Sequence, residues 1–98
     1  MGIMDFLKEP EILAQLAEEA AELSQAALKL RRALEGTNPT PVTVEDAREN
    51  LTEEAADVYL CLEILNVCID NPKVLEFRQQ KRRRWIQRLA YNAVKGKK

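Results

Sequence analysis

The strongest constraint on the fold is a short sequence repeat whose two copies are separated by a whole number of heptads. Residues 16–23 read LAEEAAEL and residues 51–58 read LTEEAADV, which are identical at five of eight positions. The offset is 35 residues, or five heptads. Each copy lies where apolar residues recur at alternating spacings of four and three, a pattern typical of helices that pack along one stripe. The repeat therefore predicts two long helices with matching faces.

The apolar positions predict which side chains pack. In the first helix, we expect a stripe of Leu16, Ala20, Leu23, Ala27, Leu30 and Leu34. In the second helix, we expect a stripe of Leu51, Ala55, Val58, Leu62, Leu65 and Ile69. Other apolar residues lie off these stripes, namely Ile12, Leu13, Leu28, Tyr59, Leu60 and Ile64. Apolar surface of this kind marks interaction sites, so we expect a homodimer or a dimer of dimers.

Start and stop signals place the first two helices. The first should begin near Pro10 and end at about Glu35, because proline suits a first helical position and Gly36 supplies a left-handed stop. Residues 36–42 contain two prolines and are expected to form a loop. Thr43, followed three residues later by an aspartate, resembles a capping box that opens the second helix, which we expect to run to about Ile69.

A third helix completes the predicted fold. Asn71 and Pro72 are typical of a helix cap and a first helical residue, and the helix should run to about Val94. No alternating apolar pattern predicts a strand. We therefore expect an all-α protein, an antiparallel helical hairpin plus a third long helix, assembling into a helical bundle as an oligomer. Residues 1–98 should form one domain that frays at residues 1–8 and 95–98, although the first segment has room for a short helical turn.

Carboxylates occupy equivalent positions in the two copies of the repeat. Glu19 and Glu22 lie on one flank of the first stripe, and Glu54 and Asp57 lie on the same flank of the second. In an antiparallel hairpin these flanks meet, so the four carboxylates should converge. Like charges repel at short range, and Mg²⁺, or Mn²⁺ as a substitute, would relieve that repulsion because it prefers carboxylate oxygen. The alternative is a solvated acidic face.

The available residue types exclude several chemistries. The sequence has no histidine, so it offers no Ser–His or Cys–His nucleophile and no histidine metal ligand. Its two cysteines cannot close a tetrahedral zinc site. Cys61 and Cys68 should lie about 10 Å apart along a helix, too far for a disulfide, and we expect buried free thiols. Any active site must therefore use oxygen ligands.

The acidic motifs resemble the signature of the MazG-like all-α nucleoside triphosphate pyrophosphatases, which is EExxE, a spacer and ExxD. Here the motifs read Glu18-Glu19-Ala-Ala-Glu22 and Glu54-Ala-Ala-Asp57. The surrounding QLAEEAAELSQAALKLRR, NPTPVT and ENLTEEAADVYLCLEIL also resemble small bacterial and phage members, over roughly residues 9–90. The spacer of 31 residues is somewhat long for that family.

The resemblance implies an enzyme and assigns roles to its residues. It implies Mg²⁺-dependent hydrolysis of the α–β phosphoanhydride of a nucleoside triphosphate, giving a monophosphate and pyrophosphate, in house-cleaning of nucleotide pools. Glu19, Glu22, Glu54 and Asp57 would be the Mg²⁺ ligands. Glu18, paired with Glu19 as the catalytic residues, would orient or deprotonate water. The alternative is a non-catalytic helical oligomer or interaction module with an acidic surface.

Charge is unevenly distributed along the chain. Residues 1–57 carry a net charge of −8 and residues 58–98 a net charge of +7. The family often carries a similar basic segment before a tryptophan, so we expect Lys81, on the packed face with Trp85, and Arg84 to contact substrate phosphates or to support the carboxylates. A salt-bridged surface is one alternative. Nucleic-acid binding is another, but the pI of about 5.5 and the absence of a binding motif argue against it.

Two further expectations concern the role of one aromatic residue and the location of the protein in the cell. Tyr59 is the aromatic residue nearest the acidic motif, so it could contact a nucleobase or pack in a core or interface. No segment has the apolar length of a transmembrane helix, and the N-terminus lacks the pattern of a signal peptide. These features predict a cytoplasmic protein without membrane contact.

Overall fold

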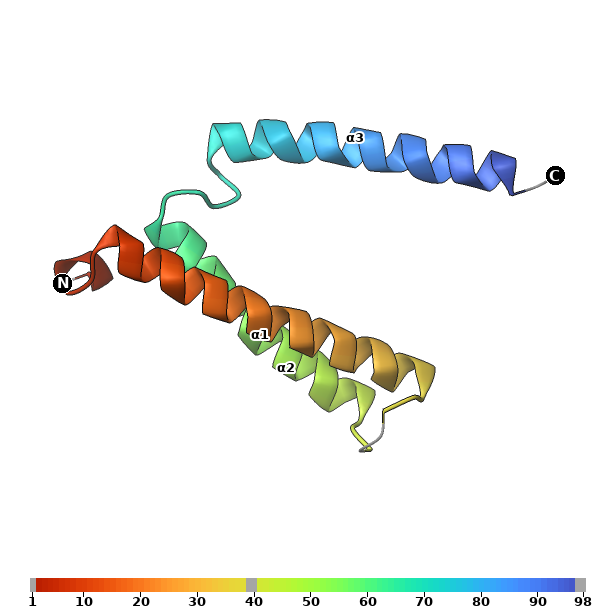
Figure 1. Cartoon of the computed structure of the whole chain (residues 1–98), viewed down its shortest axis with the longest axis horizontal. Coiled ribbons are helices and arrows are strands. Elements are labelled where there is room, and N and C mark those ends of the chain that lie inside the picture. Colours follow the sequence, from red (N-terminus) through yellow and green to blue (C-terminus); the bar gives the residue numbers. More distant parts are fainter. Residues whose placement is uncertain (1, 39–40, 97–98) are drawn as a thin grey trace. The chain divides into compact units, whose positions relative to one another are not determined.

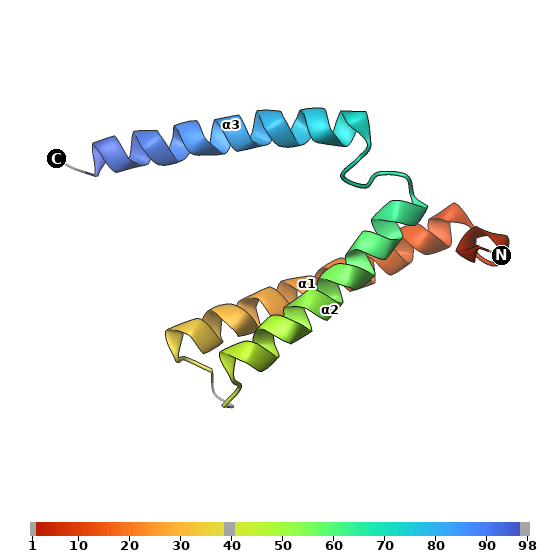
Figure 2. The same ribbon diagram turned by 180° about the vertical axis from the view of Figure 1, so that it is seen from behind.

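The computed structural model describes residues 2–38 and 41–96, and the structural statements below concern those residues. They form a short 3₁₀ helix, η1 (Ile3–Asp5), and three α-helices, α1 (Glu9–Glu35), α2 (Val44–Ile64) and α3 (Pro72–Lys95), without a strand (Figure 1). Helices α1 and α2 run antiparallel and lie side by side in both views (Figures 1 and 2). The predicted all-α fold, with a hairpin and a third helix, is confirmed.

The chain divides into two units at the bond between Asn66 and Val67. The first unit holds the α1–α2 hairpin and the second holds α3. The expectation of one domain stays a prediction. The N-terminal segment forms η1, whose turn is stabilised by a hydrogen bond of 2.7 Å from the Gly2 amide to Asp5 Oδ2. Of the ends expected to fray, residues 1, 97 and 98 lie outside the described residues.

The ends of α1 follow the sequence signals closely. The Lys8 amide donates a hydrogen bond of 3.1 Å to Glu11 Oε1, which satisfies one of the free N–H groups at the helix start. Pro10 is the second helical residue, where its missing N–H costs no helix hydrogen bond. Gly36 ends the helix with φ of 71°, the left-handed conformation that glycine adopts without strain.

Helix α2 begins as predicted but ends earlier. Thr43 Oγ1 accepts a hydrogen bond of 3.0 Å from the Asp46 amide and caps the helix start. The predicted end at Ile69 is wrong, because the helix stops at Ile64. Asn66 adopts φ of 60°, and asparagine is one of the few residues that tolerate this left-handed conformation. Ile69 therefore lies in the connection to α3, where it is 64% exposed.

Helix α3 is well capped but contributes no buried side chain. Asn71 Oδ1 accepts hydrogen bonds from the amides of Lys73 and Val74, at 2.9 and 3.3 Å, and Pro72 is the first helical residue. The helix extends to Lys95, close to the predicted end. No residue of α3 is buried. Large apolar side chains of the face that was expected to pack are exposed, namely Leu75, Phe77, Trp85, Ile86 and Leu89.

The core of the hairpin lies on stripes rotated from the predicted ones. Its buried side chains are Ile12, Ala26, Leu30, Ala47 and Cys61. In α1 the predicted Leu16, Leu23 and Leu30 do lie on the packed stripe, at half-buried or buried positions. The predicted Ala20, Ala27 and Leu34 are exposed, and their places are taken by Glu19, Ala26 and Ala33.

Helix α2 shows the same rotation. Leu51, Val58 and Leu65, which directly follows the last helical residue, stay at half-buried positions, and they are joined by the half-buried Glu54 and the buried Cys61. Ala55 and Leu62 remain half-buried beside this stripe, so the packed face of α2 is wider than predicted. Leucines spaced by seven residues belong equally to two adjacent stripes, and only the partner helix selects between them. The selected stripe brings Ile12, which was expected to lie off the stripes, into the core, where it is 2% exposed. It also draws two glutamates toward the helix interface.

Candidate metal centre

Four carboxylates converge at the middle of the hairpin. Glu19 and Glu22 of α1 and Glu54 and Asp57 of α2 each place one oxygen so that all four lie within 4.8 Å of one another. The convergence predicted from the repeat is confirmed. Glu19 and Glu54 are half-buried, whereas Glu22 and Asp57 are exposed. The cluster therefore has an inner pair within the helix interface and an outer pair in contact with solvent.

The inner pair carries buried oxygens without donors. Oε2 of Glu19 and Oε2 of Glu54 are buried and accept no hydrogen bond from the described residues. The other oxygen of Glu19 accepts a bond of 2.7 Å from Gln15 Nε2. A buried carboxylate oxygen without a donor is costly, and the cost is larger when like charges surround it. A divalent cation bound among these oxygens would remove both costs.

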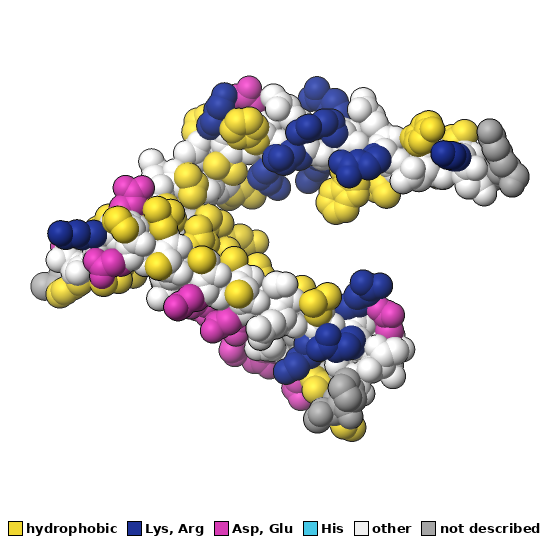
Figure 3. Space-filling model, in the orientation of Figure 1, with side chains coloured by type: hydrophobic (Ala, Val, Ile, Leu, Met, Phe, Trp, Pro, Cys, Tyr) yellow, Lys and Arg dark blue, Asp and Glu magenta, His cyan; other side chains and the backbone are white. Residues whose placement is uncertain are grey.

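No basic side chain neutralises the cluster within the described residues. The salt bridges found there join Arg31 to Glu35 and Lys73 to Glu76, and neither includes one of the four carboxylates. Figure 3 shows acidic side chains in a line along one edge of the hairpin, and basic side chains near its loop end. The donor set, four carboxylates and no nitrogen or sulfur ligand, is one that Mg²⁺, Mn²⁺ or Ca²⁺ prefers.

The cluster changes the proton affinity of its neighbours. The hydrogen bond from Gln15 lowers the pKa of Glu19, but desolvation and the charges of Glu22 and Asp57 raise it, and the net pKa lies above the ordinary value of 4.5. Desolvation, followed by the charges of Glu19 and Asp57, raises the pKa of the Cys61 thiol. Both shifts have one physical cause, which is uncompensated negative charge in a partly dehydrated place.

The cysteines are free thiols, as expected, but only one is buried. Cys61 is 5% exposed and lies in the hairpin core. Cys68 is half-buried and lies outside α2, because the helix ends before it. Its thiol donates a hydrogen bond of 2.7 Å to Asp70 Oδ1, and this bond, with burial and the charge of Asp70, raises the pKa of Cys68. The expectation that both thiols are buried on one helix is therefore wrong for Cys68.

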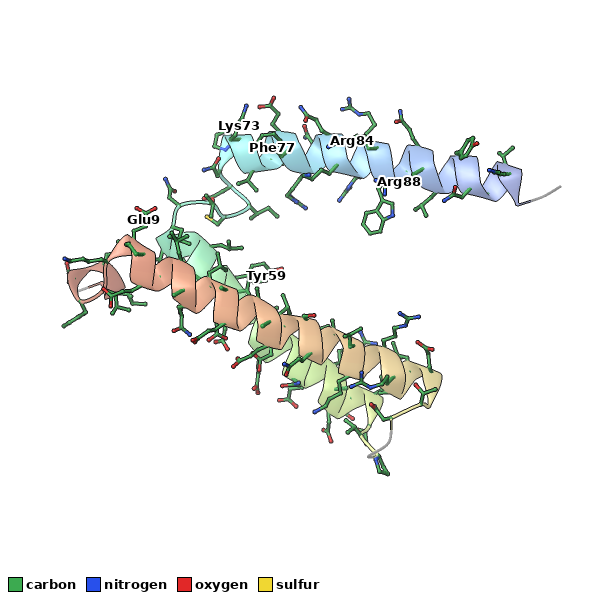
Figure 4. All side chains as sticks on the ribbon, in the orientation of Figure 1. Glu9, Tyr59, Lys73, Phe77, Arg84 and Arg88 are labelled. Atoms are coloured by element: carbon green, nitrogen blue, oxygen red, sulfur yellow. The ribbon has the colours of Figure 1, made fainter. Side chains whose placement is uncertain are left out.

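Other predicted site residues lie outside the cluster. Glu18 is exposed on α1 and is not among the four convergent carboxylates. Tyr59 is 68% exposed, so it does not pack in the hairpin core, and it projects from α2 in Figure 4. Lys81 and Arg84 lie on α3, in the second unit, and line two different hollows there. Catalytic and phosphate-binding roles for Glu18, Lys81 and Arg84 stay predictions.

The structure adds residues that the sequence reasoning missed. A hollow of about 520 Å³ adjoins the carboxylates, and Lys29 and Arg32 are among its lining residues. A signal for them is present in the sequence. Glu22, Gln25, Lys29 and Arg32 follow one another at spacings of three, four and three, which places them along one flank of α1.

Comparisons with protein-family models, characterised proteins and solved structures find no match for this chain. None of the helices in the described part of the chain combines the length and the apolar character needed to cross a membrane. The family resemblance of the acidic motifs therefore stays a prediction.

Proposed function

We propose that this protein is a Mg²⁺-dependent nucleoside triphosphate pyrophosphohydrolase. One observation carries the proposal. Four carboxylate oxygens from two helices lie within 4.8 Å of one another, and the inner pair contributes buried oxygens without a hydrogen-bond donor. A solvated acidic surface has no reason to bury such oxygens, because water satisfies carboxylates better than an apolar interface does. The resemblance of the two motifs to the MazG-like signature supports the same function.

The site suits phosphoanhydride hydrolysis. The reaction needs charge neutralisation and an aligned water more than a protein nucleophile. Bound Mg²⁺ would supply the Lewis acid that neutralises phosphate charge. The exposed outer pair, Glu22 and Asp57, leaves the solvent side of the centre open to substrate. Water adds to the α-phosphorus, the bond to the bridging oxygen breaks, and that oxygen leaves with its electron pair on pyrophosphate. Glu18, which precedes Glu19 on α1, accepts the proton from water.

The second unit has a supporting role in the proposal. Lys81 and Arg84 of α3 contact substrate phosphates, and their exposure leaves them accessible. The chain acts as a homodimer or dimer of dimers in the cytoplasm, where it removes unwanted nucleotides. Large apolar side chains are exposed on the hairpin as well as on α3, including Leu13, Leu28 and Leu60. This exposure also favours the alternative, a non-catalytic helical oligomer.

The test is product analysis over a panel of ribo- and deoxyribonucleoside triphosphates with and without Mg²⁺. We expect equal amounts of monophosphate and pyrophosphate from at least one substrate, and none in the presence of EDTA. Release of orthophosphate and a nucleoside diphosphate would place cleavage at the β–γ bond and contradict the proposal. Absence of any turnover, in a protein that also fails to bind Mn²⁺ by isothermal titration, would favour the non-catalytic oligomer.

A further inference from the structure

The hollow beside the carboxylate cluster is lined by acidic side chains at one end and by basic side chains at the other. It holds about 520 Å³ between α1 and α2, and its polar lining consists of Glu22, Gln25, Lys29, Arg32, Asn50 and Glu54. Along α1, Lys29 lies about 10 Å and Arg32 about 15 Å from Glu22, at a rise of about 1.5 Å per residue. Because the helices are antiparallel, Asn50 lies on the loop side of Glu54. The carboxylates thus mark one end and the two cations the other.

The guanidinium of Arg32 is held in place by the loop that follows α1. Its Nε donates a hydrogen bond of 3.0 Å to Asn38 Oδ1. The side-chain amide of Asn38 in turn donates, through Nδ2, a hydrogen bond of 3.3 Å to the backbone carbonyl of Lys29, near the end of the helix. Asn38 can reach back because Gly36 turns the chain in the left-handed conformation. The bond to Asn38 uses Nε, so a phosphate would bind the guanidinium end-on, through its two terminal Nη groups.

We propose that this hollow is the subsite for the diphosphate end of the nucleotide, which becomes the pyrophosphate leaving group. The inference rests on the proposed function and adds a substrate-binding role for Lys29 and Arg32. A diphosphate seated here has the carboxylate-bound cation on one side and two basic side chains on the other. Negative charge develops on the leaving oxygen during cleavage, and fixed positive charge near it stabilises the transition state. Asn38 is a positioning residue that acts through Arg32.

The direct test measures binding of inorganic pyrophosphate to the full chain by isothermal titration in the presence of Mg²⁺. We expect Arg32→Ala to weaken pyrophosphate binding about tenfold or more, because hydrogen bonds to charged groups have that effect. Lys29→Ala should weaken it in the same direction. Binding of a nucleoside monophosphate should change by less than about twofold, since that product leaves the diphosphate subsite empty.

Arg31→Ala is the matched control. It removes the same charge from the neighbouring position, but the Arg31 side chain is 73% exposed, pairs with Glu35 and does not line the hollow. Its pyrophosphate affinity should equal that of the wild type. If Arg31→Ala and Arg32→Ala weaken binding equally, the effect is one of general charge and the subsite is overturned. Thermal melting of each variant confirms folding.

The positioning role of Asn38 has its own readout. Asn38→Ala should weaken pyrophosphate binding in the wild-type background and have little effect in the Arg32→Ala background, because interacting residues are not additive. Equal effects in both backgrounds would contradict a role through Arg32.

Two results separate this inference from the proposed function. Hydrolysis of nucleotides by the wild type, together with unchanged pyrophosphate binding in Arg32→Ala and Lys29→Ala, would overturn the subsite but leave the proposed enzymatic function standing. Pyrophosphate binding that depends on Arg32, without hydrolysis of any nucleotide, would support the subsite and contradict the proposed enzymatic function. Failure of the wild-type protein to bind pyrophosphate would overturn the subsite outright.

Discussion

The hairpin and α3 begin with the same kinds of signal but differ in what stabilises them. Thr43 and Asn71 cap α2 and α3 in the same way, with a side-chain oxygen that accepts from backbone amides. The hairpin then buries apolar side chains from both of its helices, whereas α3 buries none over 24 residues. Isolated helices are marginal in water, and most helical stability in proteins comes from packing. We therefore expect α3 to depend more strongly on a partner surface than the hairpin does.

The same comparison separates the two kinds of charge. The acidic half of the chain places its candidate metal ligands by packing, since Glu19 and Glu54 lie on the stripes where α1 meets α2. The basic half places Lys81 and Arg84 only on the surface of a single helix. A set of ligands held by two packed helices is preorganised, and a row of cations on one exposed helix is not. The hairpin is thus the part where mutations should have large and specific effects.

The largest expected effect is on turnover. Glu19→Gln or Asp57→Asn should reduce nucleotide hydrolysis about a thousandfold, because loss of metal charge stabilisation is worth several kcal/mol. The fold should remain intact or gain stability without metal, since each change removes a charge from a repulsive cluster. Glu53→Gln, an exposed neighbour outside the cluster, is the control. Unfolding of the Glu19 or Asp57 variant would instead identify that residue as structural.

The next largest effect is the stabilisation of the protein by a bound metal, which should depend on residues of the hairpin and not on residues of α3. Mg²⁺ or Mn²⁺ at about a hundred times its dissociation constant should stabilise the protein by about 2.7 kcal/mol. For a chain of this size, that is a rise in melting temperature of roughly 10 °C or more. Differential scanning calorimetry should show the rise in the wild type and in Arg84→Ala, but not in Glu19→Gln. A shift that survives Glu19→Gln would place the metal elsewhere.

A smaller effect should reveal the partner of α3. Trp85 is 64% exposed, and a tryptophan at the centre of an interface contributes about 2 kcal/mol or more. Trp85→Ala should raise the dissociation constant of the dimer about thirtyfold or more, measured by light scattering over a dilution series. Leu34→Ala, at an exposed position of the hairpin, tests whether the interface lies there instead. A wild-type mass near 11.2 kDa at micromolar concentration would contradict the dimer.

The smallest effect is a pH dependence confined to the metal-free hairpin. The pKa of Glu19 is raised above its ordinary value of 4.5, so folding favours the protonated form. The stabilisation from this proton is complete below the ordinary pKa and is lost as pH rises through the folded value. Urea unfolding in EDTA should show the stability of Glu19→Gln relative to wild type increasing as pH rises from about 4 to 7. A constant difference over that range would mean that Glu19 ionises normally in the folded protein.

Some features were predictable because their causes are local. Gly36 and Asn71 act on backbone groups a few residues away, so the sequence alone locates the end of α1 and the start of α3. The early end of α2 was not predicted. Asn66 interrupts an apolar run, and nothing local distinguishes a helical asparagine from a left-handed one. Lys29 and Arg32 were missed because their spacing gains meaning only beside the second helix, which forms the other wall of the hollow.

The amino-acid sequence by itself determined the three helices and the equivalence of the two acidic motifs, because capping acts within one helix and the heptad spacing is the same in both copies of the repeat. Only the tertiary structure decided which stripe packs. Leu16, Leu23 and Leu30 allow either of two adjacent faces, and the fit of α2 against α1 selected the one that contains Glu19. That selection half-buries Glu19 and Glu54 and leaves an oxygen of each without a donor. Burial depends on two surfaces at once, so no property of a single helix could predict it.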